Sequence, residues 1–246
     1  MWFKCITCEV FARPVYFCAA YSQNIIDVEL VQRGLHNQPD YLHQHLQEKI
    51  NSADLRNYDA VLLSYGLCGK AIDGLVAQKH PLVIPLAHDC ITLFLGSRNR
   101  YNEQFTNFPG TYWYVKDYIE RNDDTGGSLV LGTGLSGNIE KQYQEYVQKF
   151  GKDNADYLMD VMGAWQQHYK RAALIDMNIG DTTSVQNQAQ EEAKKNGWVF
   201  ERLTGDINLI HSLLEGKWEK NFLVVNPGQK VSMTFDENII GCFVNE

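Results

Sequence analysis

Apolar residues gather in short unbroken runs along the first hundred residues of the chain, and segments of helical periodicity separate these runs. Runs of this length, bounded by polar or turn-forming residues, are typical of strands buried on both faces of a sheet. The expected strands are residues 2–8, 25–31, 60–65 and 82–87. Between them, apolar residues recur at helical spacing. The expected helices are residues 11–19, 39–55, 72–78 and 92–104.

The second half of the chain repeats this alternation after a different kind of segment. Residues 109–136 are rich in glycine and aromatic residues, and the run RNDDTGG at residues 121–127 within them predicts an exposed loop. Two helices are expected next, at residues 139–149 and 153–169. The later expected elements are strands at 172–177, 198–203 and 222–225, with helices at 185–195 and 206–215 between them.

Strands that alternate with helices favour an α/β fold, here a Rossmann-like parallel sheet with helices on both faces, arranged as two β-α-β lobes. The expected divisions are an N-terminal lobe over residues 1–108, a loop and helical connection over 109–170, and a C-terminal lobe over 171–246. Ligands bind such sheets beyond the carboxyl ends of the strands, so the residues that follow each strand are the first candidates for a functional site.

Composition and charge narrow the class of protein. With 246 residues, 44% of them hydrophobic, the chain can bury a large core. Its formal net charge is -8, and no run of lysines and arginines is longer than two, which argues against a nucleic-acid partner. We expect no membrane segment, because no window approaches about 18 consecutive apolar residues. Without a signal sequence at the N-terminus, a cytoplasmic protein is expected.

Six cysteines in a reducing compartment are not a disulfide framework, so each is a buried residue, a metal ligand or a reactive group. Three cysteines lie at the carboxyl ends of expected strands: Cys8 closes the first, Cys68 closes the third, and Cys90 lies just past the fourth. Because the carboxyl ends of parallel strands share one edge, these three thiols are expected to lie near one another. The remaining cysteines lie in apolar segments and are expected in the core: Cys5, Cys18 and Cys242.

Cys68 lies in the sequence YGLCG, residues 65–69. Glycines close on either side let the backbone turn sharply, and a helix that follows would present its positive end and free amides to a thiolate. Such a setting lowers the pKa of a thiol. The alternative is a tight turn from strand to helix that carries a small residue for packing alone.

The tripeptide His88-Asp89-Cys90 follows the fourth expected strand. In an extended segment residues two apart point the same way, so His88 and Cys90 can face one ion while Asp89 acts as a base or supports a ligand. Imidazole and thiolate are ligands that zinc and iron-sulfur clusters prefer. The alternative is a histidine with ordinary hydrogen-bond partners at the start of a helix.

Three further patterns carry less weight. Cys5 and Cys8 have the spacing of a redox dithiol, but Cys5 lies inside a strand and not at a helix N-terminus. Residues 132–137 match G-x-G-x-x-G, yet no β-α-β unit follows, which favours a loop. Residues 178–183 and 226–230 follow strands and offer amides or hydroxyls, as ordinary caps and turns also do.

Assembled along the chain, these residues resemble the bacterial and archaeal family known as domain of unknown function 1638. The segments that carry the resemblance are Cys8-Glu9 with Arg13, Gly34-Leu35-His36, residues 65–69, residues 88–92, Gly96-Ser97-Arg98 with Tyr101, residues 109–112 and, more loosely, Trp218 and Pro227-Gly228. At residues 69–71 the chain has Gly-Lys-Ala where the family pattern has Gly-Asn-Gly, which argues against a phosphate-binding role for that loop. The resemblance implies no activity. Family members often neighbour genes for corrinoid-dependent methyl transfer, which implies corrinoid or methyltransferase proteins as partners.

The first hypothesis is a metal-dependent enzyme in which zinc activates a thiol or a water molecule for reaction with a small-molecule substrate. The expected metal ligands are Cys8, Cys68, Cys90 and His88. The candidates for proton transfer are Glu9, Tyr65 and Asp89, and those for binding the substrate are Arg13, His36, Arg98 and Tyr101. The ligand pattern is similar to the zinc site of thiol methyltransferases, which have a different, barrel fold.

Two alternatives stay open. The same three cysteines can hold a [4Fe-4S] cluster with one open iron, because three thiolates without a fourth suit that cluster equally well. The chain can also be a non-catalytic metal-binding accessory protein or metallochaperone for methyl-transfer proteins. That alternative predicts tight metal binding without a pocket of roughly a few hundred Å³ beside the metal.

Overall fold

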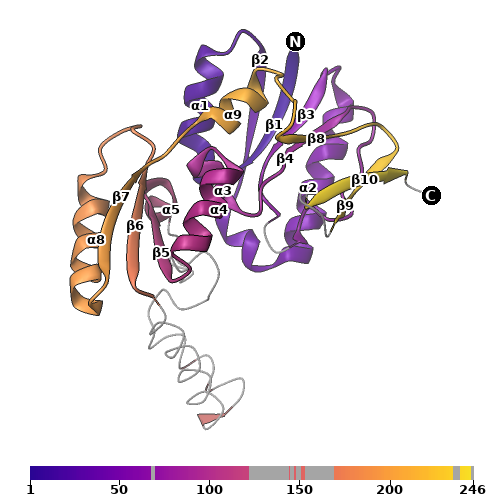
Figure 1. Cartoon of the computed structure of the whole chain (residues 1–246). Coiled ribbons are helices and arrows are strands. Elements are labelled where there is room, and N and C mark those ends of the chain that lie inside the picture. The colour runs from indigo at the N-terminus through magenta and orange to yellow at the C-terminus, as the bar shows by residue number, and fades with distance from the viewer. Residues whose placement is uncertain are drawn as a thin grey trace. The chain divides into compact units, whose positions relative to one another are not determined.

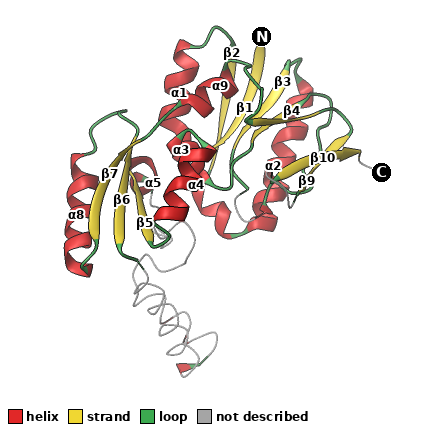
Figure 2. Cartoon of the chain, in the orientation of Figure 1, coloured by secondary structure: helices red, strands yellow, loops and turns green. Residues whose placement is uncertain are grey.

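Figure 1 shows the computed structural model of the chain, and Figure 2 shows the same view coloured by secondary structure. The structure describes residues 1–67, 70–121, 144, 147, 151–152, 169–234 and 239–244. The chain divides into two compact units. The first contains Met1–Tyr101 and Gly205–Glu246, and the second contains Asn102–Thr204.

The first unit contains a five-stranded sheet in the order β2-β1-β3-β4-β8. Its strands are β1 (Trp2–Cys8), β2 (Ile25–Val31), β3 (Ala60–Ser64), β4 (Leu82–Pro85) and β8 (Phe222–Val225). The first four are parallel, and β8 runs antiparallel to β4 with Val225 opposite Leu82. β3 and β4 are buried along their whole length, as expected of strands covered on both faces. The predicted α/β fold with a mostly parallel sheet is confirmed.

Helices cover both faces of this sheet (Figure 2). On one face, Ile6 of β1 shares a core with α2 (Pro39–Ser52), whose buried residues recur at every fourth position: Leu42, Leu46 and Ile50. On the other face, α1 (Ala12–Tyr21) packs against α9 (Asn208–Leu214). Phe3 points to this second face, because neighbouring residues of a strand alternate, and its ring lies 5.2 Å from that of Trp218.

The segment after β3 corrects a prediction. In place of the helix expected over residues 72–78, residues 71–74 form a turn, and Val76 forms an isolated bridge with Lys230. Gly74 has a left-handed φ of 82°, which interrupts a helix, and its amide donates to the carbonyl of Val231 at 2.9 Å. The partner is a hairpin that the sequence analysis did not predict, β9 (Gln229–Met233) with β10 (Ile240–Val244).

The helix expected over residues 92–104 is two helices, α3 (Cys90–Leu95) and α4 (Arg98–Asn107). Gly96 ends α3 with a left-handed φ of 67°. A Cβ atom at Gly96 would lie 2.6 Å from the Cβ of Asp206, so the position needs glycine for packing as well. The amide of Asp206 donates to the carbonyl of Phe94 at 2.9 Å and fixes this end of α3.

The second unit contains a parallel three-stranded sheet in the order β5-β6-β7. Its elements are β5 (Thr111–Val115), α5 (Lys116–Glu120), β6 (Arg171–Asp176), α8 (Thr183–Asn196) and β7 (Val199–Thr204). β5 is a strand that the sequence analysis did not predict: Tyr112 and Tyr114 are buried in one core with Ala172 and Leu174 of β6. A run of aromatic and β-branched residues is typical of a strand, and the nearby glycines obscured this signal.

The compact units differ from the divisions expected at residues 1–108, 109–170 and 171–246. Residues 205–246 belong to the first unit, because β8 pairs with β4 and α9 packs against α1. The β6-α8-β7 segment has the β-α-β arrangement expected of a second lobe. The motif at 132–137 lies outside the described residues, as does most of the two helices expected between 139 and 169.

Candidate functional site

The carboxyl ends of β1, β3 and β4 lie side by side, because these strands are parallel and adjacent. Cys8 is the last residue of β1, and Cys90 is the first residue of α3, which follows β4. The loop after β3 contacts the loop after β4 directly. The amide of Leu67 donates to the carbonyls of Ala87 and His88, at 3.1 and 3.2 Å. The three strand ends therefore converge as expected.

Gly66 allows the close approach of these two loops. A Cβ atom at this position would lie 2.6 Å from the Cα of Asp89 and 2.8 Å from its backbone N and C atoms. Any side chain would push the loop after β3 away from the loop after β4. Gly66 is not among the glycines with positive φ, so packing and not backbone conformation requires it. This accounts for one of the two glycines around Cys68.

Cys8 is half-buried among charged and polar groups. Burial raises the pKa of its thiol to about 11; Glu9 also raises it, while the Val10 amide, the Tyr65 hydroxyl and Arg33 lower it. The thiol is therefore protonated at neutral pH and would lose its proton on binding a metal ion. Tyr65 is 2% exposed, and its hydroxyl lowers the pKa of Cys8, so these two predicted residues do lie together.

Arg33 is a component of this edge that the sequence analysis missed. It begins the short 3-10 helix η2 (Arg33–Asn37) after β2 and is 2% exposed. Its backbone amide donates to Oε1 of Glu9 at 2.8 Å, and its guanidinium lowers the pKa of Cys8. A buried guanidinium is costly unless anionic or thiolate neighbours balance it. An arginine directly after a strand, at the edge where ligands bind, was the signal available in the sequence.

Asp89 caps α3. Its Oδ1 accepts a hydrogen bond from the amide of Thr92 at 3.2 Å, the usual arrangement of an N-cap aspartate. Its Oδ2 accepts one from the Tyr101 hydroxyl at 3.0 Å. Burial raises the pKa of Asp89, and the hydrogen bonds from Thr92 and Tyr101 oppose that rise. Asp89 therefore has a structural role, and its role in proton transfer stays a prediction.

Tyr101 joins His88 to this group. The two rings stack with centroids 5.9 Å apart and planes 24° apart. His88 is exposed, whereas Cys90 is 7% exposed. Burial and the Asp89 carboxylate raise the pKa of the Tyr101 hydroxyl, which therefore keeps its proton and donates it to Asp89. Tyr101, predicted to bind substrate, thus lies beside two other predicted site residues.

The remaining candidates for substrate binding are located by their elements. Arg13 is the second residue of α1, which follows β1 through the turn η1 (Glu9–Phe11), and Arg98 is the first residue of α4. Both side chains are half-buried. His36 belongs to η2, and its side chain lies outside the described part of the structure. Their roles in binding a substrate stay predictions.

The metal ligands are brought together only in part. Among the described residues, no group of three or more histidine, cysteine, aspartate or glutamate side chains is arranged to hold a metal ion. Cys68 lies outside the described residues, so a metal site here requires that residue. The turn after Cys8 does reach the helix that Cys90 begins, because the Phe11 and Phe94 rings pack with centroids 4.6 Å apart.

The other described cysteines lie away from this edge. Cys5 and Cys18 are 0% and 2% exposed, and burial raises the pKa of their thiols to about 12 and about 11. Both are core residues, which also argues against Cys5 as a redox nucleophile. Cys242 of β10 is half-buried against the edge of the core. No disulfide joins any of the five described cysteines.

The loop after β6 in the second unit is explained by turn formation. Asp176 is 3% exposed and accepts hydrogen bonds from the amide of Asn178 at 2.9 Å and from the Thr182 hydroxyl at 3.2 Å. It also pairs with Arg202. The amide and hydroxyl of Thr183 both donate to Asp181. These contacts fit the ordinary capping that was the alternative for residues 178–183.

Fold and site together define an α/β protein with a Rossmann-like parallel sheet and cysteines at the carboxyl edge of that sheet. A family model described as "Protein of unknown function (DUF1638)" matches residues 30–214, more than half of the chain. The chain belongs to this family, which confirms the resemblance. No curated protein and no solved structure matches the chain. Among the described residues, no helix is long and apolar enough to cross a membrane.

Proposed function

We propose that the chain is a metal-dependent enzyme that binds its metal at the carboxyl edge of the first sheet. The proposed metal is zinc, and the proposed ligands are Cys8, Cys68, Cys90 and His88. The observation that carries the proposal is the contact of Leu67 with the carbonyls of Ala87 and His88. This contact brings the residue before Cys68 against the segment that leads to Cys90. Cys8 ends β1, the strand next to β3 in the same sheet.

The chemistry of the donors supports this choice of metal. Thiolates combined with an imidazole are a common set of zinc ligands. Bound there, zinc would supply Lewis acidity toward a thiol or a water molecule. Arg33 offers a buried positive charge beside Cys8, and Tyr101 holds the carboxylate of Asp89 in one orientation.

The remaining roles follow from position at the same edge. Glu9, Tyr65 and Asp89 are the proposed proton-transfer residues, because each contacts another group of the site. Arg13 and Arg98, near the starts of α1 and α4, are proposed to bind an anionic group of a small-molecule substrate.

The cellular setting is also a proposal. Cysteines outside disulfides are typical of a reducing compartment, so the five described cysteines, none of them in a disulfide, support a cytoplasmic protein. A partnership with corrinoid or methyltransferase proteins is proposed from the family alone. Transfer of a methyl group to a metal-held thiol would fit both the ligand set and such partners.

Metal and acid-labile sulfide analysis, with an absorption spectrum, on protein purified without oxygen tests the proposal. We expect about one zinc per chain in the wild type, and loss of that zinc in Cys8→Ala, Cys68→Ala and Cys90→Ala. Cys18→Ala and Cys242→Ala are the matched controls and should keep it. Circular dichroism of every variant separates loss of metal from loss of fold.

The other outcomes are equally definite. Iron with sulfide and a brown colour would show that the same three cysteines hold a [4Fe-4S] cluster in place of zinc. Metal retained at wild-type stoichiometry in all three folded site variants would overturn the proposed ligands. Tight zinc binding without binding of any small-molecule thiol would favour a metallochaperone or accessory protein.

A further inference from the structure

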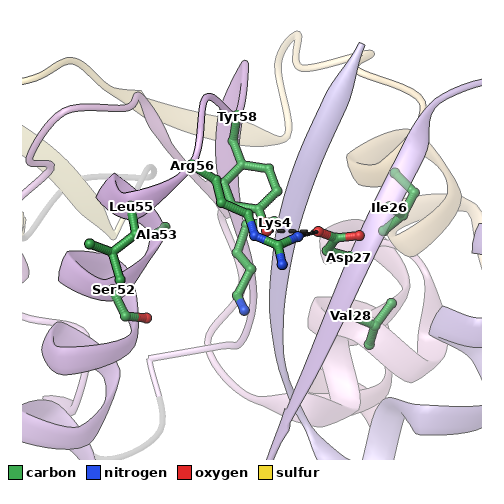
Figure 3. Close-up of a pocket in the computed structure, with 9 residues that line it drawn as sticks. All are labelled: Lys4, Ile26, Asp27, Val28, Ser52, Ala53, Leu55, Arg56 and Tyr58. Carbon is green, nitrogen blue, oxygen red and sulfur yellow. Dashed lines mark hydrogen bonds and ion pairs between the residues drawn. The ribbon is translucent and has the colours of Figure 1, made fainter.

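A cavity of about 500 Å³ opens beside β2 in the first unit (Figure 3). Its lining comes from β1, β2, the end of α2 and the short helix η3 (Ala53–Leu55). Lys4 and Asp27 belong to the amino-terminal halves of their strands, so the cavity lies away from the carboxyl edge that carries Cys8. Its volume falls in the range of small-molecule sites, about 300–1,000 Å³.

The cavity exists because α2 leaves part of the sheet uncovered. Lys4 and Asp27 are paired in the register of β1 and β2, so their side chains share a face. It is the face on which Ile6 packs against α2, but the buried residues of α2 end at Ile50. Polar side chains therefore cover this part of the sheet in place of apolar ones. Figure 3 shows two of them, Asp27 and Arg56, pointing toward each other.

The charges around the cavity are unequal. Glu29 pairs with Lys4 at 2.5 Å and also with Lys49, and Asp27 pairs with Arg56 at 3.1 Å. Of the charged residues that line the cavity, Lys4 and Arg56 are cations and Asp27 is an anion, an excess of one positive charge in a chain whose formal net charge is -8. A local positive excess in an acidic protein favours an anionic ligand.

The Arg56 guanidinium is available to such a ligand. Its side chain is 61% exposed, and an exposed ion pair adds little stability. The Arg56 guanidinium can therefore leave Asp27 for an anionic ligand with little loss of folding free energy. The Tyr58 hydroxyl donates to the same Oδ2 of Asp27 at 2.7 Å, so Asp27 keeps a partner when Arg56 turns away. Arg56 also lies over the Trp2 ring, 5.9 Å from its centroid, which limits its freedom.

An apolar wall completes the cavity. Leu55 is 88% exposed, and with Ala53 and the Tyr58 ring it lines one side. We propose that this cavity is a second ligand site, one that binds a small organic anion. Arg56 and Lys4 hold the carboxylate or phosphate of the ligand, and its apolar part lies against Leu55 and Tyr58.

Calorimetric titration with phenyl phosphate tests the proposal, with benzylamine as a cation of similar shape. We expect saturable binding of phenyl phosphate, weaker binding of inorganic phosphate and none of benzylamine. Arg56→Gln should weaken phenyl phosphate binding by roughly tenfold or more. Lys4→Gln should also weaken it, while Glu29 keeps Lys49 as partner. The exposed Lys194→Gln on α8 is the control and should bind as the wild type does.

The result that overturns the proposal is equally clear. It fails if the wild type does not bind phenyl phosphate, if benzylamine binds as tightly, or if Arg56→Gln binds like the wild type. Should Lys4→Gln not fold, Arg56→Gln still decides, because its side chain is exposed. Cys8→Ala should bind phenyl phosphate normally, so failure of the metal proposal leaves this one standing.

Discussion

Gly66 lies directly against the main chain of Asp89: a Cβ atom at Gly66 would come within 2.6 Å of the Asp89 Cα. The contact joins the loop after β3 to the loop after β4, which leads through Cys90 into α3. The hydrogen bonds from Leu67 to Ala87 and His88 strengthen the same junction. The glycine before Cys68 thus serves the assembly of the site and not the turn alone.

Gly66→Ala is expected to destabilise the protein strongly. Overpacking costs about 1–3 kcal/mol, and we expect the upper end because the atoms that meet the new methyl group are backbone atoms that cannot turn aside. Urea unfolding measures the change. Gly228→Ala is the control. Apart from its chain neighbours, no atom of the described residues lies within 4 Å of the position a Cβ would take there, so only its positive φ opposes alanine, at about 1–2 kcal/mol. Equal stability of Gly66→Ala and wild type would contradict the close contact.

The hydrogen bond from Tyr101 to Asp89 should be measurable as a coupling. Tyr101→Phe removes the donor and should lower the free energy of unfolding by about 1–2 kcal/mol. Asp89→Asn keeps an acceptor for the Thr92 amide and should cost less. The double variant should lose less free energy of unfolding than the sum of the two single-variant losses, by at least about 0.5 kcal/mol. Tyr16→Phe, at a tyrosine that is 50% exposed, is the control; strict additivity would argue against the bond.

Several elements were predictable because local pattern and tertiary structure agree. The unbroken apolar run of β3 is buried along its length, and α2 buries every fourth residue. One prediction failed where distant contacts decide, because residues 72–78 bond to β9 in place of forming a helix. The strand β8 was predicted, but its antiparallel pairing with β4 in the first sheet was not. A local pattern does not specify a partner more than a hundred residues away.

The candidate site divides in the same way. Residues at strand ends, such as Cys8 and Tyr65, could be selected because parallel strands share a carboxyl edge. Arg33 was missed because arginines are usually exposed, and only the structure shows that this one is buried. The stacking of His88 on Tyr101 depends on the break at Gly96, which redirects α4.

Lys70 has a left-handed φ of 78°, a conformation that favours glycine or asparagine. Lys70→Gly should therefore raise the free energy of unfolding by about 0.5–1 kcal/mol, after the extra freedom of glycine in the unfolded chain is subtracted. Lys70→Ala removes the long side chain but keeps the Cβ atom, so it should stay close to the wild type. Thermal and urea unfolding of the three proteins compare them. A gain in both variants would trace the effect to the side chain and refute the backbone explanation.

The thiols should differ in their reaction with iodoacetamide at pH 8. Burial raises the pKa of Cys5 to about 12 and of Cys18 to about 11, so both are neutral thiols at that pH and also lack access to the reagent. Cys242 is half-buried on the β9–β10 hairpin and should be alkylated before Cys5 and Cys18. Peptide mass spectrometry identifies each site, and denatured protein gives the full reaction as control. Early modification of Cys18 would show that α1 opens readily.

Asp176 should make the stability of the protein depend on acid pH. Burial alone would raise the pKa of Asp176, but the Asn178 amide, Arg202 and the Thr182 hydroxyl together hold it below its ordinary value. A depressed pKa stabilises the fold fully above the pKa of the unfolded carboxyl, about 3.9, and this contribution is lost as pH falls through the folded value.

Asp176→Asn is expected to cost about 1–3 kcal/mol at pH 7, because it weakens a buried hydrogen-bonded network. The difference from the wild type should shrink as the pH falls below about 4, since protonation then removes from the wild type the charge that the variant lacks at every pH. Urea unfolding at a series of pH values measures it. Glu191→Gln, an exposed carboxylate-to-amide change on α8, is the control and should follow the wild type. A difference that grows on acidification would mean that the pKa of Asp176 is raised in the folded state.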